Sequence, residues 1–237
     1  MQAEPLLLVP GLMCDHTVWE PLLPTLNAGR VCTVVDHGMA DSLPRMARQL
    51  LDAAPDRFAI AGHSMGARVA LEVLRQAPGR VTRVALLDTG YQARASGAAG
   101  EEEARKRHAL LTLAREQGVR AMATAWVQGM VHPARLGDAS LIEAILAMFE
   151  RKSADVFACQ IHALLERPDA SDVLASLQVP TLILCGRQDG WAPVAQHEAM
   201  QRLAPGSVLN VIEDAGHMAP MERPEAVTGA LVHWLAS

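Results

Sequence analysis

The feature that most constrains this chain is the turn Gly62-His63-Ser64-Met65-Gly66, which lies between an apolar run and a helical pattern. The run Phe58–Ala61 is typical of a buried strand, and residues 64–76 have the periodicity of a helix. A chain that passes from strand to helix so abruptly must fold tightly, and only glycine leaves room at positions 62 and 66. The turn therefore projects the Ser64 hydroxyl past the strand, toward the N–H groups that begin the helix.

Short apolar runs alternate with helical patterns in the rest of the chain, which predicts an α/β fold. Continuous apolar runs are typical of strands buried on both faces, so we expect a mostly parallel sheet of about six strands with flanking helices. The expected strands lie near Leu6–Val9, Val31–Val35, Phe58–Ala61, Val84–Leu87, Thr181–Cys185 and Val208–Ile212. Three flanking helices are expected at about Ser42–Ala53, with Ser42 as N-cap, Ser64–Gln76 and Pro224–Leu235.

The alternation stops between residues 91 and 168, where only helical patterns occur. We interpret this stretch as a helical cap inserted into a core formed by residues 1–90 and 169–237. The sheet pattern resumes at Val179-Pro180-Thr181, so the cap is not expected to form a separate domain. Its helices are expected near Glu101–Gln117, Val119–Gly129, Ser140–Lys152 and Ala154–Arg167, after a small-residue loop at Ala95–Gly100.

A serine hydroxyl needs a base to accept its proton during attack, and the base needs an orienting carboxylate. His217 is the expected base, because it follows the strand Val208–Ile212 in a loop before the last helix. Asp189 is the expected carboxylate, because it follows the strand at 181–185 in a similar loop. The chain order Ser64, Asp189, His217 is the order typical of a serine nucleophile on this kind of turn.

Other residues compete for these roles. Asp88 also lies just past a strand and is the main alternative carboxylate, whereas Asp214 is too close to His217 in sequence to orient it easily. His63 is expected to point away from its neighbour Ser64, and His37 could lie at the rim of the pocket.

Attack on a carbonyl creates a negatively charged oxygen, which two preorganised donors can stabilise. The backbone N–H of Met65 is one expected donor, since it follows the nucleophile. The second is expected from the loop after the first strand, at Leu12, with Met13 as the alternative; Pro10 has no N–H to donate.

Composition and charge exclude several other classes. The net charge is −5, and no long basic run is present, so nucleic-acid binding is not expected. The start lacks a positively charged segment, and the run Leu6–Val9 is too short for a signal peptide or a membrane span, which predicts a cytoplasmic protein without a membrane partner. The four cysteines form no CxxC pair, and no metal site is expected.

These motifs resemble the α/β-hydrolase superfamily of esterases, lipases and C–C hydrolases. Leu8-Val9-Pro10-Gly11 looks like the family's first central strand and oxyanion loop, with Pro10 where a His is usual. Asp36-His37-Gly38 resembles the family's Asp-x-x-Gly turn in shortened form, and Ala67 replaces a common third glycine. The usual N-terminal antiparallel strands are absent from the pattern. Members with an Asp nucleophile are disfavoured by Ser64, and hydroxynitrile lyases by Met218, where those enzymes carry a Lys.

The resemblance implies a serine hydrolase that cleaves a small carboxylic ester through an acyl-enzyme, with no cofactor. A C–C hydrolase, an enol-lactonase or a cofactor-free perhydrolase would use the same triad, and a non-catalytic ligand-binding protein on this fold is a further alternative. The pocket is expected to be mostly aliphatic, without an obvious charged partner for an ionic substrate; Arg68 and Arg151 stay open as exceptions. The oligomeric state stays open. The expected pocket residues are Trp126, Met130, Phe149, Phe157, His162, Trp191 and Met218.

Overall fold

The computed structural model describes residues 4–237, and its centre is an all-parallel sheet of six strands. The strand order is β2-β1-β3-β4-β5-β6, so the chain reverses its direction of travel between β1 and β3. Open parallel sheets bind ligands beyond the carboxyl ends of their strands at such a point. The six-stranded parallel sheet is confirmed. Its strands are β1 (Leu6–Val9), β2 (Cys32–Val34), β3 (Phe58–His63), β4 (Val81–Leu87), β5 (Thr181–Gly186) and β6 (Val208–Ile212).

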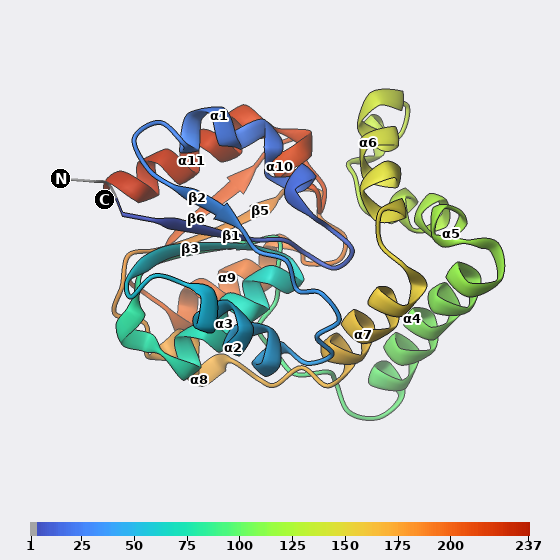
Figure 1. Ribbon diagram of the computed structural model, residues 1–237, viewed down its shortest axis with the longest axis horizontal. Coiled ribbons are helices and arrows are strands. Elements are labelled where there is room, and N and C mark those ends of the chain that lie inside the picture. The colour runs from blue at the N-terminus through green and yellow to red at the C-terminus, as the bar shows by residue number, and fades with distance from the viewer. Residues whose placement is uncertain (1–3) are drawn as a thin grey trace.

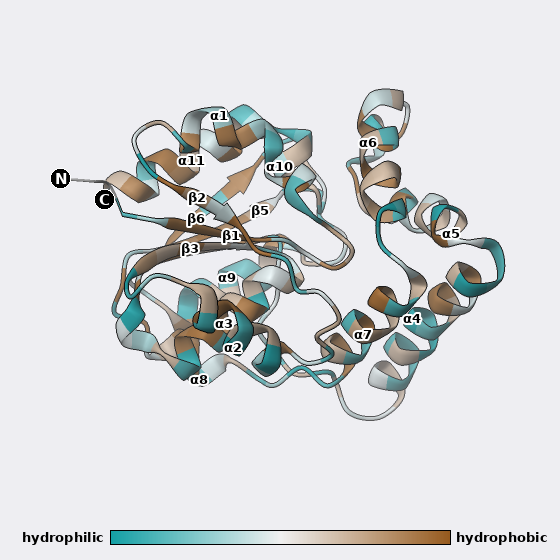
Figure 2. Cartoon of the chain, in the orientation of Figure 1, coloured by the Kyte–Doolittle hydropathy of each residue, from teal (hydrophilic) through white to brown (hydrophobic). Residues whose placement is uncertain are grey.

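The inner strands are apolar on both faces because helices cover the sheet on both sides. All residues of β1, β3 and β5 are buried, whereas the edge strands β2 and β6 are partly exposed. In Figure 2 the strands at the centre of the molecule are mostly brown, the hydrophobic end of the scale. Three predicted strands are longer than expected: β3 continues to His63, β4 begins at Val81 and β5 continues to Gly186, whereas β2 is shorter, at Cys32–Val34. The extension of β3 places the end of the strand directly before Ser64.

Two layers of helices enclose the sheet (Figure 1). Helices α1, α10 and α11 lie on one face, and α2, α3, α8 and α9 lie on the other. Their bounds are α1 (Leu23–Leu26), α2 (Leu43–Ala53), α3 (Met65–Gln76), α8 (Ser171–Ala175), α9 (Val194–Leu203), α10 (Ala219–Glu222) and α11 (Pro224–Ala236). Short 3₁₀ turns occur at His16–Val18, Glu20–Leu22, Pro78–Arg80, Val127–Gly129 and Pro133–Arg135.

Of the five α-helices between β4 and β5, the first four project to one side of the sheet (Figure 1). They match the expected helical patterns to within a few residues. Trp126 packs between two of them, with ring centroids 5.6 Å from Phe149 and 5.7 Å from Phe157. This cluster gives the four helices an apolar centre of their own, next to the sheet. The helices are α4 (Ala98–Gln117), α5 (Val119–Trp126), α6 (Ala139–Glu150) and α7 (Ala154–Leu165).

Two local expectations differ from the structure. Ser42 has the extended backbone of an N-cap, but its hydroxyl makes no capping hydrogen bond, and α2 begins with Leu43-Pro44. Proline has no N–H at this position, so fewer donors need a cap. The loop expected at Ala95–Gly100 ends early, because α4 already begins at Ala98. Within residues 4–237, no helix combines the length and the apolar character that a membrane crossing requires.

Candidate active site

Ser64 lies on a strained turn between β3 and α3. Its backbone has φ 54° and ψ −117°, a region that residues with a Cβ rarely occupy. A Cβ on Gly66 would overlap the carbonyl oxygen of Val9, and one on Gly62 would overlap that of Gly66. The two glycines are therefore needed for close backbone approach. The Ser64 N–H donates to Leu87 O at 2.8 Å, which ties the turn to the end of β4.

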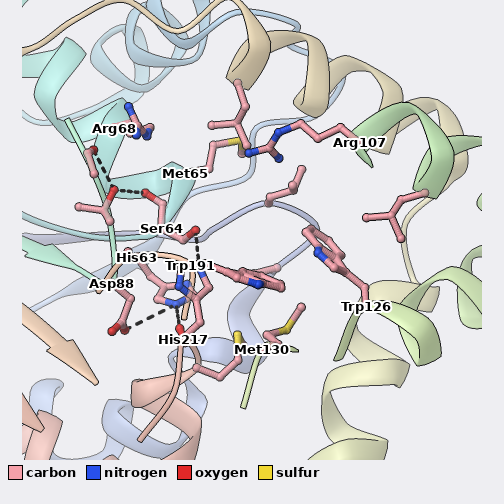
Figure 3. A pocket seen from close by; sticks show the side chains of 18 of the residues that line it. His63, Ser64, Met65, Arg68, Asp88, Arg107, Trp126, Met130, Trp191 and His217 are labelled. Atoms are coloured by element: carbon pink, nitrogen blue, oxygen red, sulfur yellow. Dashed lines mark hydrogen bonds and ion pairs between the residues drawn. The ribbon is translucent and has the colours of Figure 1, made fainter. Parts of the chain in front are cut away.

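Ser64, His217 and Asp189 lie in one chain of hydrogen bonds. Ser64 Oγ is 2.8 Å from His217 Nε2, and His217 Nδ1 is 2.8 Å from Asp189 Oδ2. Asp189 is 3 % exposed and His217 is 6 % exposed, so both side chains are largely shielded from water. This geometry allows the imidazole to accept the serine proton while the carboxylate stabilises the imidazolium. Figure 3 shows the Ser64 and His217 side chains pointing toward each other, and both line the same cavity.

The surroundings of Asp189 favour its ionised form. Burial by itself raises the pKa of this carboxyl, but the His217 ring and two backbone donors outweigh it and hold the pKa below its ordinary value. The donors are the N–H groups of Trp191 and Ala192, each 2.9 Å from Oδ1. A charged acceptor is thus maintained beside the ring nitrogen.

The backbone around His217 is held by a carboxylate that the sequence did not single out. Glu222 Oε1 accepts the N–H groups of Gly216, at 2.9 Å, and Met218, at 3.2 Å. The N–H of His217 itself donates to Met130 O at 2.8 Å. Glu222 is buried, and burial raises its pKa. The sequence contains one indication of this contact, because Glu222 is an acidic residue in the otherwise apolar segment that follows His217.

His63 also supports the His217 loop. Its side chain is buried, and its Nε2 lies 2.8 Å from His217 O. Burial and the neighbouring His217 ring lower the pKa of His63 to about 3, so the neutral ring donates this hydrogen bond. His63 therefore turns away from the Ser64 hydroxyl, as expected, and contacts the backbone of the candidate base.

The alternative carboxylates lie elsewhere. Asp88 is fully buried with φ 50°, and its Oδ1 accepts the N–H of Gly186 at 2.9 Å. Its Oδ2 has no hydrogen-bond partner in the described part of the chain and is 3.8 Å from His63 Nε2. Burial and the charge of Asp189 raise the pKa of Asp88 well above its ordinary value. Asp214 is exposed and pairs with Arg223 at 3.3 Å.

The N–H groups of Leu12 and Met65, the two expected oxyanion donors, make no hydrogen bond to an acceptor among residues 4–237. The alternative donor Met13, with φ 62°, already donates to Gln160 Oε1 on α7 at 2.8 Å. His37 was expected near the pocket rim, but it is buried, does not line the cavity, and contacts Pro10 O through Nε2 at 3.2 Å. His37 therefore contacts the backbone of the loop after β1 on the side away from the cavity.

A cavity of about 280 Å³ opens beside Ser64. His162 was expected to line it, but this prediction is wrong: the side chain is exposed on the outer face of α7 and does not reach the cavity. Phe157 and Leu164 occupy the inner face of the same helix. Trp191 lies half-exposed at the mouth, stacked on Trp126 at a centroid distance of 5.3 Å. The expected residues that line the cavity are Trp126, Met130, Phe149, Phe157, Trp191 and Met218.

The cavity also contains charged side chains, which the sequence did not predict. Arg68, Glu103, Lys106 and Arg107 line it together with the apolar residues. Arg151, the other arginine left open, is not among the lining residues and pairs with Asp15 at 2.7 Å. In Figure 3, Arg68 and Arg107 lie on the side of Ser64 away from His217.

Comparisons with known proteins are consistent with this geometry. A model described as the alpha/beta hydrolase family matches residues 6–230. The chain is 28 % identical to a pimeloyl-[acyl-carrier protein] methyl ester esterase of Photobacterium profundum, covering 94 % of this chain and 91 % of that protein. A similar esterase of Nitrosomonas europaea is also 28 % identical, over 93 % of this chain and 91 % of its own length.

Solved structures show the same fold. A thermophilic esterase from Thermogutta terrifontis, described with malate bound, superposes with a TM-score of 0.85 at 28 % identity. The match covers 99 % of this chain and 90 % of that one. An enol-lactonase from Burkholderia xenovorans has a TM-score of 0.87 at 20 % identity, over 100 % of this chain and 93 % of that one.

Proposed function

The chain belongs to the alpha/beta hydrolase family, and we propose that within it this protein is a serine esterase that cleaves small carboxylic esters. The observation that carries the proposal is the hydrogen-bonded chain from Ser64 through His217 to Asp189 beside a cavity. The relatives named as esterases support ester cleavage rather than another reaction of the same triad.

In the proposed mechanism, Ser64 Oγ attacks the ester carbonyl carbon while His217 Nε2 takes the hydroxyl proton. The carbonyl oxygen becomes an oxyanion, which accepts hydrogen bonds from the N–H groups of Leu12 and Met65. The Met65 N–H also lies at the first turn of α3, where the helix dipole favours negative charge. Asp189 stabilises the imidazolium at Nδ1 throughout this step.

Collapse of the tetrahedral intermediate breaks the bond to the alcohol, which leaves with the proton held on His217. Water then enters, gives a proton to His217 and attacks the acyl carbon by the same route. The products are a free carboxylic acid and the regenerated Ser64 hydroxyl. All proton transfers use one imidazole, which is why the contacts that fix the His217 loop matter for activity.

We also propose that residues 91–168 act as the cap over a core made of residues 1–90 and 169–237. Side chains from this segment, including Trp126, Phe149 and Phe157, form one wall of the cavity, and Ser64 and His217 form the other. Two hydrogen bonds join this segment to the loops that carry the proposed reacting groups: Gln160 Oε1 accepts the N–H of Met13, next to Leu12, and Met130 O accepts the N–H of His217. The cap is therefore expected to select the acyl group.

Replacement of Ser64 tests the proposal. We expect Ser64→Ala to lower kcat for a p-nitrophenyl ester by about 10⁴- to 10⁶-fold, because the nucleophile of a triad is lost. A fluorophosphonate should label the wild-type protein at Ser64, as read by peptide mass spectrometry, and circular dichroism should show that the variant is folded. Wild-type turnover in the variant would contradict the assignment, and labelling without turnover on an ester panel would favour a binding protein.

A further inference from the structure

Arg68 lies on α3, the helix that begins directly after the candidate nucleophile. It follows Ser64 by four residues and belongs to the first turn or so of that helix. Side chains on a helix tilt toward its N-terminus, so the guanidinium extends back toward the end of α3 that holds Ser64. The two side chains line the same cavity, and Figure 3 shows both at its wall.

The Arg68 guanidinium lacks a charged partner. Its hydrogen bond runs from Nη1 to Gln92 O at 2.9 Å, and no carboxylate oxygen of residues 4–237 lies within ion-pair distance. Burial and the nearby cations Arg167 and Arg107 lower its pKa. Arg68 is only partly exposed, and a partly buried cation without a counter-ion favours an anionic ligand.

The neighbouring charges strengthen this preference. Arg107 and Arg167 share a single carboxylate, Glu103: Arg107 Nε lies 3.0 Å from Oε1, and Arg167 Nη2 lies 2.8 Å from Oε2. The charge of Asp169 also acts on Arg68, so three guanidinium groups lie near two carboxylates, which leaves an excess of one positive charge. A second hollow, which adjoins the cavity, is lined by the three arginines and Glu103. A substrate bound at Ser64 could therefore extend to the positively charged side chains.

Exposed arginines on the inserted helices α4 and α5 form ion pairs with carboxylates, whereas Arg68 on α3 forms none within the described part of the chain. Arg105 binds Glu102 at 2.6 Å, and Arg120 binds Glu143 at 2.6 Å and Glu150 at 3.0 Å. The unbalanced positive charge of this region consequently lies inside, at the cavity, rather than on the outer surface of α4 and α5. That distribution fits a small anionic substrate better than an acidic protein docked on those helices.

We propose that Arg68 and Arg107 bind a carboxylate of the substrate, so that the preferred substrates are monoesters of dicarboxylic acids. A guanidinium offers parallel N–H donors that match the two oxygens of a carboxylate. The same cavity is also lined by the apolar side chains of Leu110, Leu164 and Trp126, which suits a short methylene chain. The inference rests on the proposed esterase activity and specifies its substrate class.

The test compares two esters that differ only in charge. Monomethyl and dimethyl esters of the C4 to C7 straight-chain dicarboxylic acids are hydrolysed by the wild-type protein, and kcat/KM is measured for each. We expect the monoester to be preferred at least tenfold for one chain length. Loss of a charge-assisted hydrogen bond typically weakens binding by about 10- to 100-fold, so Arg68→Gln should lower the monoester-to-diester ratio of kcat/KM by that factor, mainly through KM.

Three further variants make the result specific. Arg68→Lys, which keeps the charge but not the paired donors, should retain part of the preference. Arg107→Gln should lower the ratio independently, which covers the case in which Arg68→Gln does not fold. Arg105→Gln removes an exposed charge from the same helix as Arg107, does not line the cavity, and should leave the ratio unchanged.

The possible failures are distinguishable. The protein could hydrolyse the diesters while neither Arg68→Gln nor Arg107→Gln lowers the monoester-to-diester ratio of kcat/KM. That result would overturn the inference, but the esterase proposal would stand. Hydrolysis of no ester would overturn both. Glutarate should inhibit the wild-type protein competitively and Arg68→Gln at least tenfold more weakly; stronger inhibition by inorganic phosphate than by glutarate would overturn the assignment of a carboxylate site.

Discussion

The loops that follow β4 and β5 each carry a buried aspartate, yet the two side chains have opposite environments. Asp88 comes directly after β4 and is 0 % exposed, and Asp189 comes three residues after β5 and is 3 % exposed. The pKa of Asp88 is raised by burial and by the charge of Asp189, whereas the pKa of Asp189 is lowered. Burial alone therefore does not decide whether a carboxyl group is charged.

The number of donors accounts for the difference. Asp189 accepts two backbone N–H groups and faces the Nδ1 of His217, and together these outweigh its desolvation. Asp88 accepts one N–H, from Gly186, and its second oxygen has no hydrogen-bond partner in the described chain. Asp189 accepts the N–H groups of residues that follow it in its own loop, whereas the one N–H that Asp88 accepts comes from the end of the neighbouring strand β5.

Asparagine at each position provides the sharpest test of this comparison. We expect Asp189→Asn to lower kcat by about 10⁴-fold, as the same change does in other Ser-His-Asp triads, because the amide no longer fixes the ring tautomer or stabilises the imidazolium. Asp88→Asn is the matched control and should lower kcat less than tenfold. Steady-state hydrolysis of a p-nitrophenyl ester measures both. A larger loss at position 88 would make Asp88 the orienting acid.

The sequence was sufficient to place Ser64, Asp189 and His217 in loops at one edge of the sheet, because parallel strands bring their carboxyl ends together. It could also rank Asp189 above Asp88 by chain order. Chain order, however, says nothing of protonation. The opposite pKa shifts depend on which N–H groups point at each carboxyl, and loop conformation decides that.

Contacts between distant segments were less accessible to sequence reasoning. Helical periodicity predicted α7 but not its rotation, so His162 was assigned to the pocket although it faces solvent. For the same reason Gln160, which faces inward and holds the Met13 N–H, was missed. The excess positive charge at Arg68 and Arg107 arises only because side chains from α3 and α4 line the same cavity, and no local sequence pattern indicates that arrangement.

His197 connects the loops that follow β4 and β5, and we expect it to contribute to stability. His197 on α9 is fully buried, and its Nε2 accepts the N–H of Thr89, the residue after Asp88, at 3.1 Å. We expect His197→Leu to destabilise the protein by about 1–3 kcal/mol, because a buried N–H loses its acceptor. Each kcal/mol corresponds to about 2–4 °C in Tm for a chain of this size, which thermal unfolding would detect.

The control for His197 is His197→Gln, whose side-chain oxygen can accept the same N–H and should recover most of the loss. Equal destabilisation by Leu and Gln would mean that the packing of the imidazole, rather than its hydrogen bond, holds the loops together.

The smallest expected effect is a change in the pH dependence of stability at Asp88. Above about pH 4, the ordinary pKa of an aspartate, the unfolded chain releases this proton, whereas the folded protein keeps it because the pKa of Asp88 is raised. The folded state then binds more protons than the unfolded state, so this group makes the free energy of unfolding fall as pH rises. The fall is about 1.4 kcal/mol for each pH unit over which only the unfolded chain is ionised.

Asp88→Asn removes this titration and keeps an oxygen that can accept the Gly186 N–H. Urea unfolding of both proteins between pH 5 and pH 8 should therefore show the variant gaining stability relative to the wild-type protein as pH rises, whatever their difference at pH 5. Asp189→Asn should not show this trend, because the pKa of Asp189 is lowered and its ionised form is already present across that range. Parallel pH profiles for wild-type and Asp88→Asn would mean that Asp88 is ionised in the folded protein, and the contrast between the two loops would disappear.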